Sequence, residues 1–399
     1  MVAKKLIGKL HLWLGLASGL VVFIVSITGC LYAFIDEIRP VVYNNRLRVE
    51  STGRPTLPVS QLRQIAQRAL GVQYPINRVD ISGASDRSWA FGASQSIPGA
   101  LTYFGETKYN YTVYVNPYTG RVLEIENSEY EFFSLVLWIH WSLLLSNDIG
   151  QPIVGTAVLV FVILLLTGLV LWWPKNKVAR KQRFSVKWNA SGKRLNYDLH
   201  NIFGFYALTF GLMVSLTGLV WAFPWLDKAV YFAATGGGSP AVEKPVLSDT
   251  TAAAVTLPLD RIVADARTQS PTARELYVSL PTTNSEVIYT YARLGQQVNY
   301  KGVSNEYDQH TARRLSSKRF EDGNRGEKVR SLNYDLHVGS ILGLPGKILA
   351  FFASFICASL PITGFLIWWG RRKKKGKLRV TVKPTIHHST YTPKPITSR

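Results

Sequence analysis

Cysteine is almost absent from this sequence of 399 residues, which contains only Cys30 and Cys357. Both lie inside long apolar runs, so the chain has no disulfide framework and no Cys–His spacing typical of a zinc site. Also missing are a glycine-rich dinucleotide fingerprint after a predicted strand, a P-loop, a Ser-His-Asp grouping and an HExxH motif. These absences exclude obvious NAD, flavin and ATP sites. A redox protein with this sequence would therefore receive its electrons from a partner protein or a quinol.

Acidic residues are missing from three basic segments of the chain. Residues 4–9 carry three lysines, residues 175–194 carry eight basic residues and residues 371–399 carry ten, and none of these segments contains Asp or Glu. Together they account for the whole formal net charge of +21. Basic residues concentrated beside apolar runs follow the positive-inside rule of membrane proteins. This distribution argues against a nucleic-acid partner and predicts that both termini and the loop after residue 174 are cytoplasmic.

Four apolar runs of about 20 residues each are long enough to cross a hydrocarbon core roughly 30 Å thick. The runs are Leu10–Ile35, Ile153–Trp173, Ile202–Trp225 and Ile348–Trp369. The first follows a charged start, as in a signal peptide, but it is too long and has no obvious small-residue cleavage site before Asp36. We therefore predict four transmembrane α-helices in contact with membrane lipid, the first of them a retained anchor.

Two polar, turn-rich regions are expected on the outer side of the membrane. In the first, Ser60 is the expected N-cap of a helix from Gln61 to Leu70. A strand at Tyr111–Val115 is followed by the turn Asn116–Gly120 and a second strand. The second region repeats these features, with Thr256-Leu-Pro258 matching Thr56-Leu-Pro58, Asp260 in the place of Ser60, and residues 305–315 resembling the strand and turn, although Ala312 replaces Gly120. Each region is predicted to be a small α+β domain.

The predicted organisation is an internal duplication of one unit: span, small domain, histidine-bearing segment, span. Between the first domain and the second span, Phe132–Leu145 reads as a helix at the outer interface that is interrupted before Pro152. The predicted segments are a first transmembrane helix (1–35), a first outer domain (36–131), the interfacial helix with the second span (132–174), a basic cytoplasmic loop (175–195), a third span (196–225), a second outer domain (226–331), a histidine-bearing segment with the fourth span (332–370) and a basic cytoplasmic tail (371–399).

One hexapeptide, Leu-Asn-Tyr-Asp-Leu-His, occurs twice and ends in His200 and His337. Each histidine precedes an apolar run that closes with Thr-Gly. His11 and His200 both stand 17 residues before such a Thr-Gly pair, whereas His140 and His337 stand 27 and 26 residues before theirs. Four histidines are therefore in register with the four spans. In the predicted topology His11 and His200 lie at the cytoplasmic edge, and His140 and His337 lie at the outer edge.

Two pairs of histidines at two depths favour haem ligation, although an isolated histidine at a helix end is more often structural. Two neutral imidazoles on neighbouring membrane helices fill both axial positions of a b-type haem and leave an electron-transfer centre. Since axial ligands must lie at similar depth, we predict two haems, one bound by His11 and His200 and the other by His140 and His337. His310, His387 and His388 are predicted to be non-ligands. Asp198 and Asp335 are interpreted as helix caps rather than as acceptors for the imidazole N–H.

The order of the motifs resembles that of the PepSY-associated transmembrane proteins of bacterial inner membranes. The similar segments are Lys9-Leu-His-Leu-Trp13, Val115-Asn-Pro-Tyr-Thr-Gly120, Asp198-Leu-His200, Leu336-His-Val-Gly339 and the Thr-Gly-x-x-x-Trp-Trp endings of the second and fourth spans. The resemblance implies two PepSY-like periplasmic domains and a similarity to haem-containing ferrisiderophore reductases. It also implies ligand roles for His11, His140, His200 and His337.

The expected function is therefore that of an oxidoreductase that moves electrons across the membrane and reduces a periplasmic ferric siderophore or other ferric chelate, which releases Fe(II). Its expected electron donor is a cytoplasmic reductase or a quinol. Two alternatives stay open. In one, PepSY-like domains bind peptides or proteins in a regulatory role and the histidines are structural; in the other, the chain is a quinol-oxidising cytochrome b.

Overall fold

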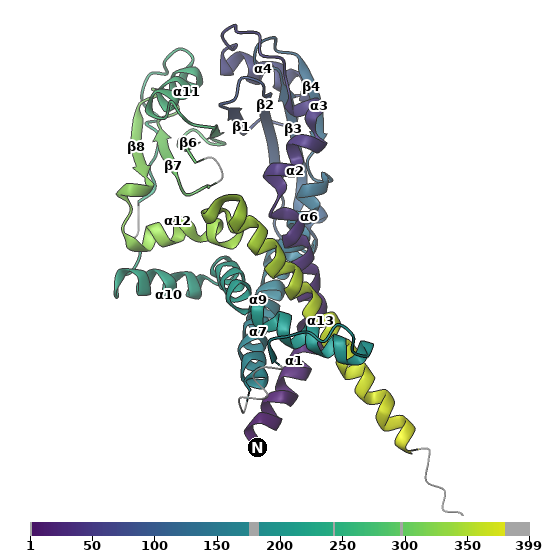
Figure 1. Cartoon of the computed structure of the whole chain (residues 1–399). Coiled ribbons are helices and arrows are strands. Elements are labelled where there is room, and N and C mark those ends of the chain that lie inside the picture. The colour runs from purple at the N-terminus through teal and green to yellow at the C-terminus, as the bar shows by residue number, and fades with distance from the viewer. Residues whose placement is uncertain (1, 175–182, 242–243, 296–297, 380–399) are drawn as a thin grey trace, which may run out of the picture.

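The computed structural model describes residues 2–174, 183–241, 244–295 and 298–379. Most of the C-terminal basic tail and part of the loop after residue 174 lie outside these ranges. Figure 1 shows a helical stem beneath two sheet-bearing lobes. Within the described residues, four helices are long and apolar enough to cross a membrane. They are α1 (Val2–Tyr32), α7 (Asn147–Trp172), α9 (Gly192–Ala222) and α13 (Gly343–Arg379).

These four helices form a bundle in which α1 and α9 each pack against both α7 and α13. Apolar side chains meet at its centre, where Val22, Phe161, Ala207 and Cys357 are buried. The outward surface is also apolar. Leu20 is 71% exposed, and Phe352 is 57% exposed. Side chains of this kind on the outside of a bundle are stable in hydrocarbon and costly in water, so the chain is a membrane protein.

Short helices connect the bundle to the outer region. After α1 come α2 (Ile35–Val42) and α3 (Asn44–Leu47); after α9 comes α10 (Pro224–Thr235). The helices α6 (Phe132–Ser142) and α12 (Arg325–His337) lead back to α7 and α13. The interruption before α7 is at Leu143 and Leu144, both with positive φ, and not at Pro152. α7 begins at Asn147, and Pro152 lies inside its first turns without interrupting it.

The outer region is built on one antiparallel sheet of eight strands in the order β4-β3-β2-β1-β5-β6-β7-β8. The strands are β1 (Arg78–Ser82), β2 (Trp89–Ser96), β3 (Thr107–Val115), β4 (Val122–Asn127), β5 (Glu275–Ser279), β6 (Ile288–Arg293), β7 (Gly302–Tyr307) and β8 (Arg314–Arg319). The strands of the two expected domains therefore join edge to edge through β1 and β5. A short helix, α5 (Tyr103–Glu106), and the 3-10 turns Phe320–Asp322 and Ser340–Leu342 complete the described elements.

Two helices cover one face of this sheet: α4 (Val59–Leu70) and α11 (Pro258–Gln269). Alternate strand residues such as Val79 and Val278 point into the core beneath them and are fully buried. Ser60 and Asp260 are not N-caps as the sequence suggested, because α4 and α11 begin one and two residues earlier, at Val59 and Pro258. Instead the Ser60 amide donates to the Asp260 carboxylate, at 3.0 Å. The Ser60 hydroxyl also donates to this carboxylate, so the two residues join the two helices.

Both predicted hairpins form. In the first, the Asn116 side chain accepts hydrogen bonds from the amides of Tyr118 and Thr119, and Gly120 has φ +72°. In the second, Asp308 takes the place of Asn116, and Ala312 adopts φ +59° although it has a Cβ. His310 lies in this turn, with Nε2 3.0 Å from the carbonyl oxygen of Asn284. This turn joins β7 and β8 of the outer sheet.

Acid should weaken the second hairpin through Asp308, which is 1% exposed. Burial alone would raise the pKa of this carboxyl group, but the amides of Asp249, Thr311 and His310 donate to it and lower the pKa to about 2. Because the folded pKa lies below the ordinary value, the stabilisation is complete above about pH 4 and is lost as the pH falls through 2. The lowered pKa corresponds to a contribution of roughly 2 kcal/mol to the free energy of unfolding. Thermal unfolding of the detergent-solubilised chain at pH 5 and pH 3 should show a smaller pH dependence for Asp308→Asn than for the wild type; equal dependence would contradict this assignment.

Candidate cofactor site

Two cavities lie one above the other in the helical bundle. The inner cavity, of about 420 Å³, is lined by residues of α1, α7, α9 and α13, among them His11 and His200. The outer cavity, of about 260 Å³, is lined by His140 and His337 as well as by the same four helices. Val22 and Phe161 line both cavities, so a single layer of side chains separates them.

The structure brings the four histidines together in two pairs. The imidazole centroids of His11 and His200 are 6.5 Å apart, with the ring planes at 89°. Those of His140 and His337 are 6.1 Å apart, at 66°. In each pair one histidine comes from the first half of the chain and the other from the second. The indole of Trp221 contacts the outer pair, at 5.2 Å from the His337 ring.

Each imidazole is held by a threonine of a neighbouring helix. The Nδ1 atoms of His11, His200 and His337 lie 2.9 Å from the hydroxyl oxygens of Thr167, Thr363 and Thr217, and that of His140 lies 3.3 Å from Thr28. These are the threonines of the four Thr-Gly pairs. The sequence indicated their register with the histidines but not that each contact crosses to another helix.

The donors in these contacts can be assigned from the atoms nearby. Each threonine hydroxyl lies 2.8–2.9 Å from the carbonyl oxygen four residues earlier in its own helix, so it donates there. Its oxygen is then an acceptor for imidazole N–H. Nδ1 of His140 also lies 2.8 Å from the Val25 carbonyl, and Nδ1 of His337 lies 3.0 Å from that of Val214. Since a carbonyl can only accept, Nδ1 carries the proton and Nε2 keeps the lone pair that binds metals.

The glycine of each Thr-Gly pair leaves room for the same imidazole. A Cβ atom on Gly29 would lie 3.0 Å from Cε1 of His140, and one on Gly218 would lie 3.2 Å from Cε1 of His337. Gly364 and Gly168 approach His200 and His11 in the same way, at 3.3 and 3.4 Å. A Thr-Gly pair therefore fixes one nitrogen of the imidazole and admits the ring edge close to the helix backbone. We call each such arrangement a Thr-Gly cradle.

The repeated hexapeptide adds a second contact to two of the cradles. Asn196 and Asn333, four residues before His200 and His337, donate to the carbonyl oxygens of Thr363 and Thr217 at 3.0 and 3.1 Å. Asn and His at this spacing lie on the same helix face. The asparagine binds the backbone of the threonine whose side chain holds the histidine.

The aspartates of the hexapeptide do not contact the histidines. Asp198 is paired with Arg194, with Nε to Oδ1 at 2.9 Å. Asp335 accepts hydrogen bonds from the amides of Asn299 and Tyr300 and from the Ser340 hydroxyl. Asp335 thereby fastens residues 299–300 to α12, and Asp198, whose Oδ2 also accepts from the Lys187 amide at 3.4 Å, fastens the segment before α9 to that helix.

The spacing of the imidazole pairs fits a pair of axial ligands. A metal about 2.0 Å from each Nε2, with each ring centre about 1.2 Å behind its nitrogen, would separate the centroids by about 6.4 Å. Among the described residues no group of three or more His, Cys, Asp or Glu is arranged to hold a metal ion. Two protein ligands suffice for a haem, because the macrocycle supplies the other four. The residues present thus fit a bis-histidine haem at each level.

Comparison with known protein families gives a match over most of the chain. No curated protein matches it. Residues 9–371 match the family model described as the PepSY-associated TM region.

Proposed function

The chain belongs to the PepSY-associated transmembrane family, and on that basis we propose that it is an oxidoreductase that carries electrons across a membrane with two b-type haems. The observation that carries the proposal is the pairing of His11 with His200 and of His140 with His337 at 6.5 and 6.1 Å, with Nδ1 of every imidazole engaged elsewhere. Haem b, when bound, supplies reversible one-electron chemistry.

The residues of the chain would bind and orient the two haems and separate them from water. The Thr-Gly cradles present Nε2 of each histidine and prevent the rings from turning. Apolar side chains such as Leu164 and Leu219 line the cavities and exclude water. Phe161 and Val22 keep the two sites one side-chain layer apart, a short separation for electron transfer.

We propose a ferric siderophore as the substrate on the outer side and a cytoplasmic reductase or a quinol as the electron donor. The support is the sequence resemblance to haem-containing ferrisiderophore reductases. One electron converts Fe(III) to Fe(II), which binds the hard oxygen donors of a siderophore more weakly and is released. The reaction requires electron transfer across the membrane, which two haems at two depths would provide.

We also propose that the halves are copies of one unit and that each outer region is a PepSY-like domain. Each half contributes, in the same order, a helix that covers the sheet (α4 or α11) and four antiparallel strands (β1–β4 or β5–β8). Each then continues into a histidine-bearing helix, α6 or α12, and a long apolar helix.

The proposed location is the bacterial inner membrane, with both termini in the cytoplasm. The reason is that the three segments rich in Lys and Arg, and free of acidic residues, flank the inner ends of the spans. Reporter fusions at Asn189 and Thr235 should therefore report opposite compartments, cytoplasm and periplasm. Activity of the same reporter at both positions would contradict this topology.

The proposed function is tested first by the visible spectrum of the purified protein. We expect a Soret band and, after addition of dithionite, the sharp α band of six-coordinate haem. The reduced protein in detergent is then mixed anaerobically with a panel of ferric siderophores, and reoxidation of the α band together with Fe(II) capture by ferrozine is followed. A colourless protein after haem supplementation would refute haem binding and favour the regulatory alternative. Haem that no ferric chelate reoxidises would refute the substrate.

A further inference from the structure

The helices that carry the outer histidines do not cross the membrane. α6 has 11 residues and α12 has 13, and His140 and His337 lie near their C-terminal ends. The depth and rotation of such helices cannot be set by insertion into the bilayer, unlike those of α1 and α9. The contacts at their N-terminal ends are therefore informative.

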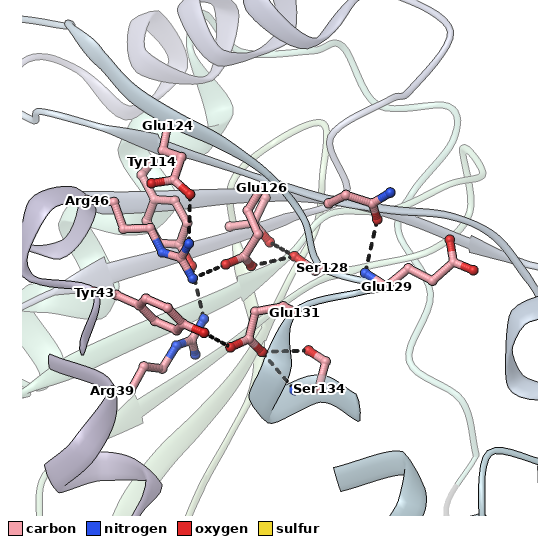
Figure 2. Close-up of polar contacts among 12 residues, drawn as sticks. Arg39, Tyr43, Arg46, Tyr114, Glu124, Glu126, Ser128, Glu129, Glu131 and Ser134 are labelled. Carbon is pink, nitrogen blue, oxygen red and sulfur yellow. Dashed lines mark hydrogen bonds and ion pairs between the residues drawn. The ribbon is translucent and has the colours of Figure 1, made fainter. Parts of the chain in front are cut away.

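The first of these ends is held by Tyr43, which lies between α2 and α3. The N-cap residue of α6 is Glu131, whose Oε2 accepts from the amide of Ser134 at 2.7 Å, while its Oε1 accepts from the Tyr43 hydroxyl at 2.7 Å. The guanidinium of Arg46 lies over the Tyr43 ring, at 3.6 Å from its centroid. Figure 2 shows this arrangement, with Arg46 also bonded to Glu124. The tyrosine is thus fixed by a buried arginine and in turn binds the cap of α6.

The second end is held by Tyr231 of α10 in a comparable way. The N-cap residue of α12 is Asn324, whose side chain accepts from the amide of Glu327 and donates to the Tyr231 hydroxyl at 2.7 Å. The guanidinium of Arg330 lies over the Tyr231 ring at 4.6 Å, and its Nε donates to Asp227 at 2.8 Å. Because Gly326 has no side chain, the first turn of α12 can lie directly against the Tyr231 ring.

α6 and α12 are consequently each attached at both ends. The C-terminal end is attached to the span that precedes the helix, and the N-terminal end to the short helices that follow that span. α6 is bound at its cap by Tyr43 and at His140 by Thr28 and Val25 of α1. α12 is bound at its cap by Tyr231 and at His337 by Thr217 and Val214 of α9. Two attachments fix both the position of a helix along its axis and its rotation. Without the attachment at the cap, the N-terminal end of the helix would be held less firmly.

We propose that Tyr43 and Tyr231 are positioning residues, and that their bonds to the helix caps set the distance between His140 and His337. The cap residues differ in chemistry, a carboxylate in one half and an amide in the other, and the covering arginines come from α3 and α12. A tyrosine hydroxyl bound to the cap beneath a guanidinium is what the two halves share. The inference rests on the proposed haem sites only where it concerns the iron. Axial ligation tolerates little displacement of the histidine nitrogens, so a shift of α6 or α12 would change the outer haem.

The test uses Tyr43→Phe and Tyr231→Phe, which remove only the hydroxyl groups. The control is Tyr118→Phe, since the Tyr118 hydroxyl bonds the Ser85 carbonyl and not the cap of either helix. Hydrogen–deuterium exchange of the full-length protein in detergent should be about tenfold faster for α6 amides in Tyr43→Phe and for α12 amides in Tyr231→Phe, in line with the loss of one hydrogen bond. Each variant should leave the other helix unchanged, and the control should leave both unchanged.

Low-temperature EPR of the oxidised protein supplies the second measurement. In both Tyr→Phe variants the low-spin signal of the outer haem should shift or broaden while that of the inner haem stays the same, which a general loss of stability would not produce. Unchanged exchange in the helix whose cap bond was removed would overturn the inference, as would equal changes in both haem signals. If the wild type contains no haem, the proposed function fails, and the exchange rates alone decide the positioning role.

Discussion

Substitution of His200 by alanine should remove the inner haem and leave the outer one. His11→Ala should have the same result, because a haem between these histidines loses one of its only two protein bonds in either variant. His140→Ala and His337→Ala should remove or perturb the other haem. The pyridine haemochrome assay should show a fall from about two haems per chain to about one, and redox titration should show which midpoint disappears.

The pattern across the four variants is more informative than any one of them. The double variant His11→Ala/His200→Ala should lose no more haem than either single variant, since the two residues act on one site. His310→Ala, in the β7–β8 turn, should retain both haems and serves as the control. Loss of the same haem in His11→Ala and His140→Ala would contradict the pairing seen in the structure.

Gly29→Val should empty the outer site without any change to a histidine. A Cβ at this position would already lie 3.0 Å from Cε1 of His140, and valine adds two further methyl groups to that Cβ. The imidazole cannot move away easily, because its Nδ1 is bonded to Val25 and Thr28. We expect the haem occupancy of the outer site to fall by about tenfold or more, a cost of at least about 1.4 kcal/mol, with the inner site unaffected.

Gly370→Val is the matched control, since it makes the same change of helix propensity within α13, where a Cβ would meet no atom within 4 Å. Haem content and the two midpoint potentials should be those of the wild type. Equal loss of haem in both variants would show that a β-branched residue in the helix, and not contact with His140, is responsible.

The histidine pairs could be predicted from the sequence because they depend on distance along helices. The 17 residues from His11 or His200 to Thr-Gly lie within one helix, whereas His140 and His337 each precede a span that runs back across the bundle. The structure places His11 beside His200 and His140 beside His337. The apolar runs likewise located the four long helices. The ends of the helices differ from the ends of the apolar runs where polar residues continue a helix. For example, α9 begins at Gly192, ten residues before Ile202, because Asn196 and Asp198 have hydrogen-bond partners within the protein.

Contacts between distant segments could not be predicted in this way. Alternation of buried residues identifies the inner face of a strand, but it does not say that β1 will pair with β5, nearly 200 residues further along. The cap position of Ser60 was a sound local interpretation, yet the side chain instead meets Asp260. The sequence shows the constant spacing between histidines and threonines. It does not show which helix supplies the threonine that contacts each histidine, because that depends on the packing of the bundle.

The pairing of β1 with β5 has a consequence for the symmetry of the whole molecule. Asp80 and Tyr277, the middle residues of these two strands, are paired with each other, as residues on a two-fold axis must be. Ser60 meets Asp260 above them, and below them His140 meets His337 and His11 meets His200. If the two halves are copies of one unit, as proposed above, these four contacts join corresponding residues and are those that a two-fold axis between the halves would produce. Each of the two proposed haem sites would therefore take one histidine from each half of the chain, and neither half alone would supply both ligands of a site.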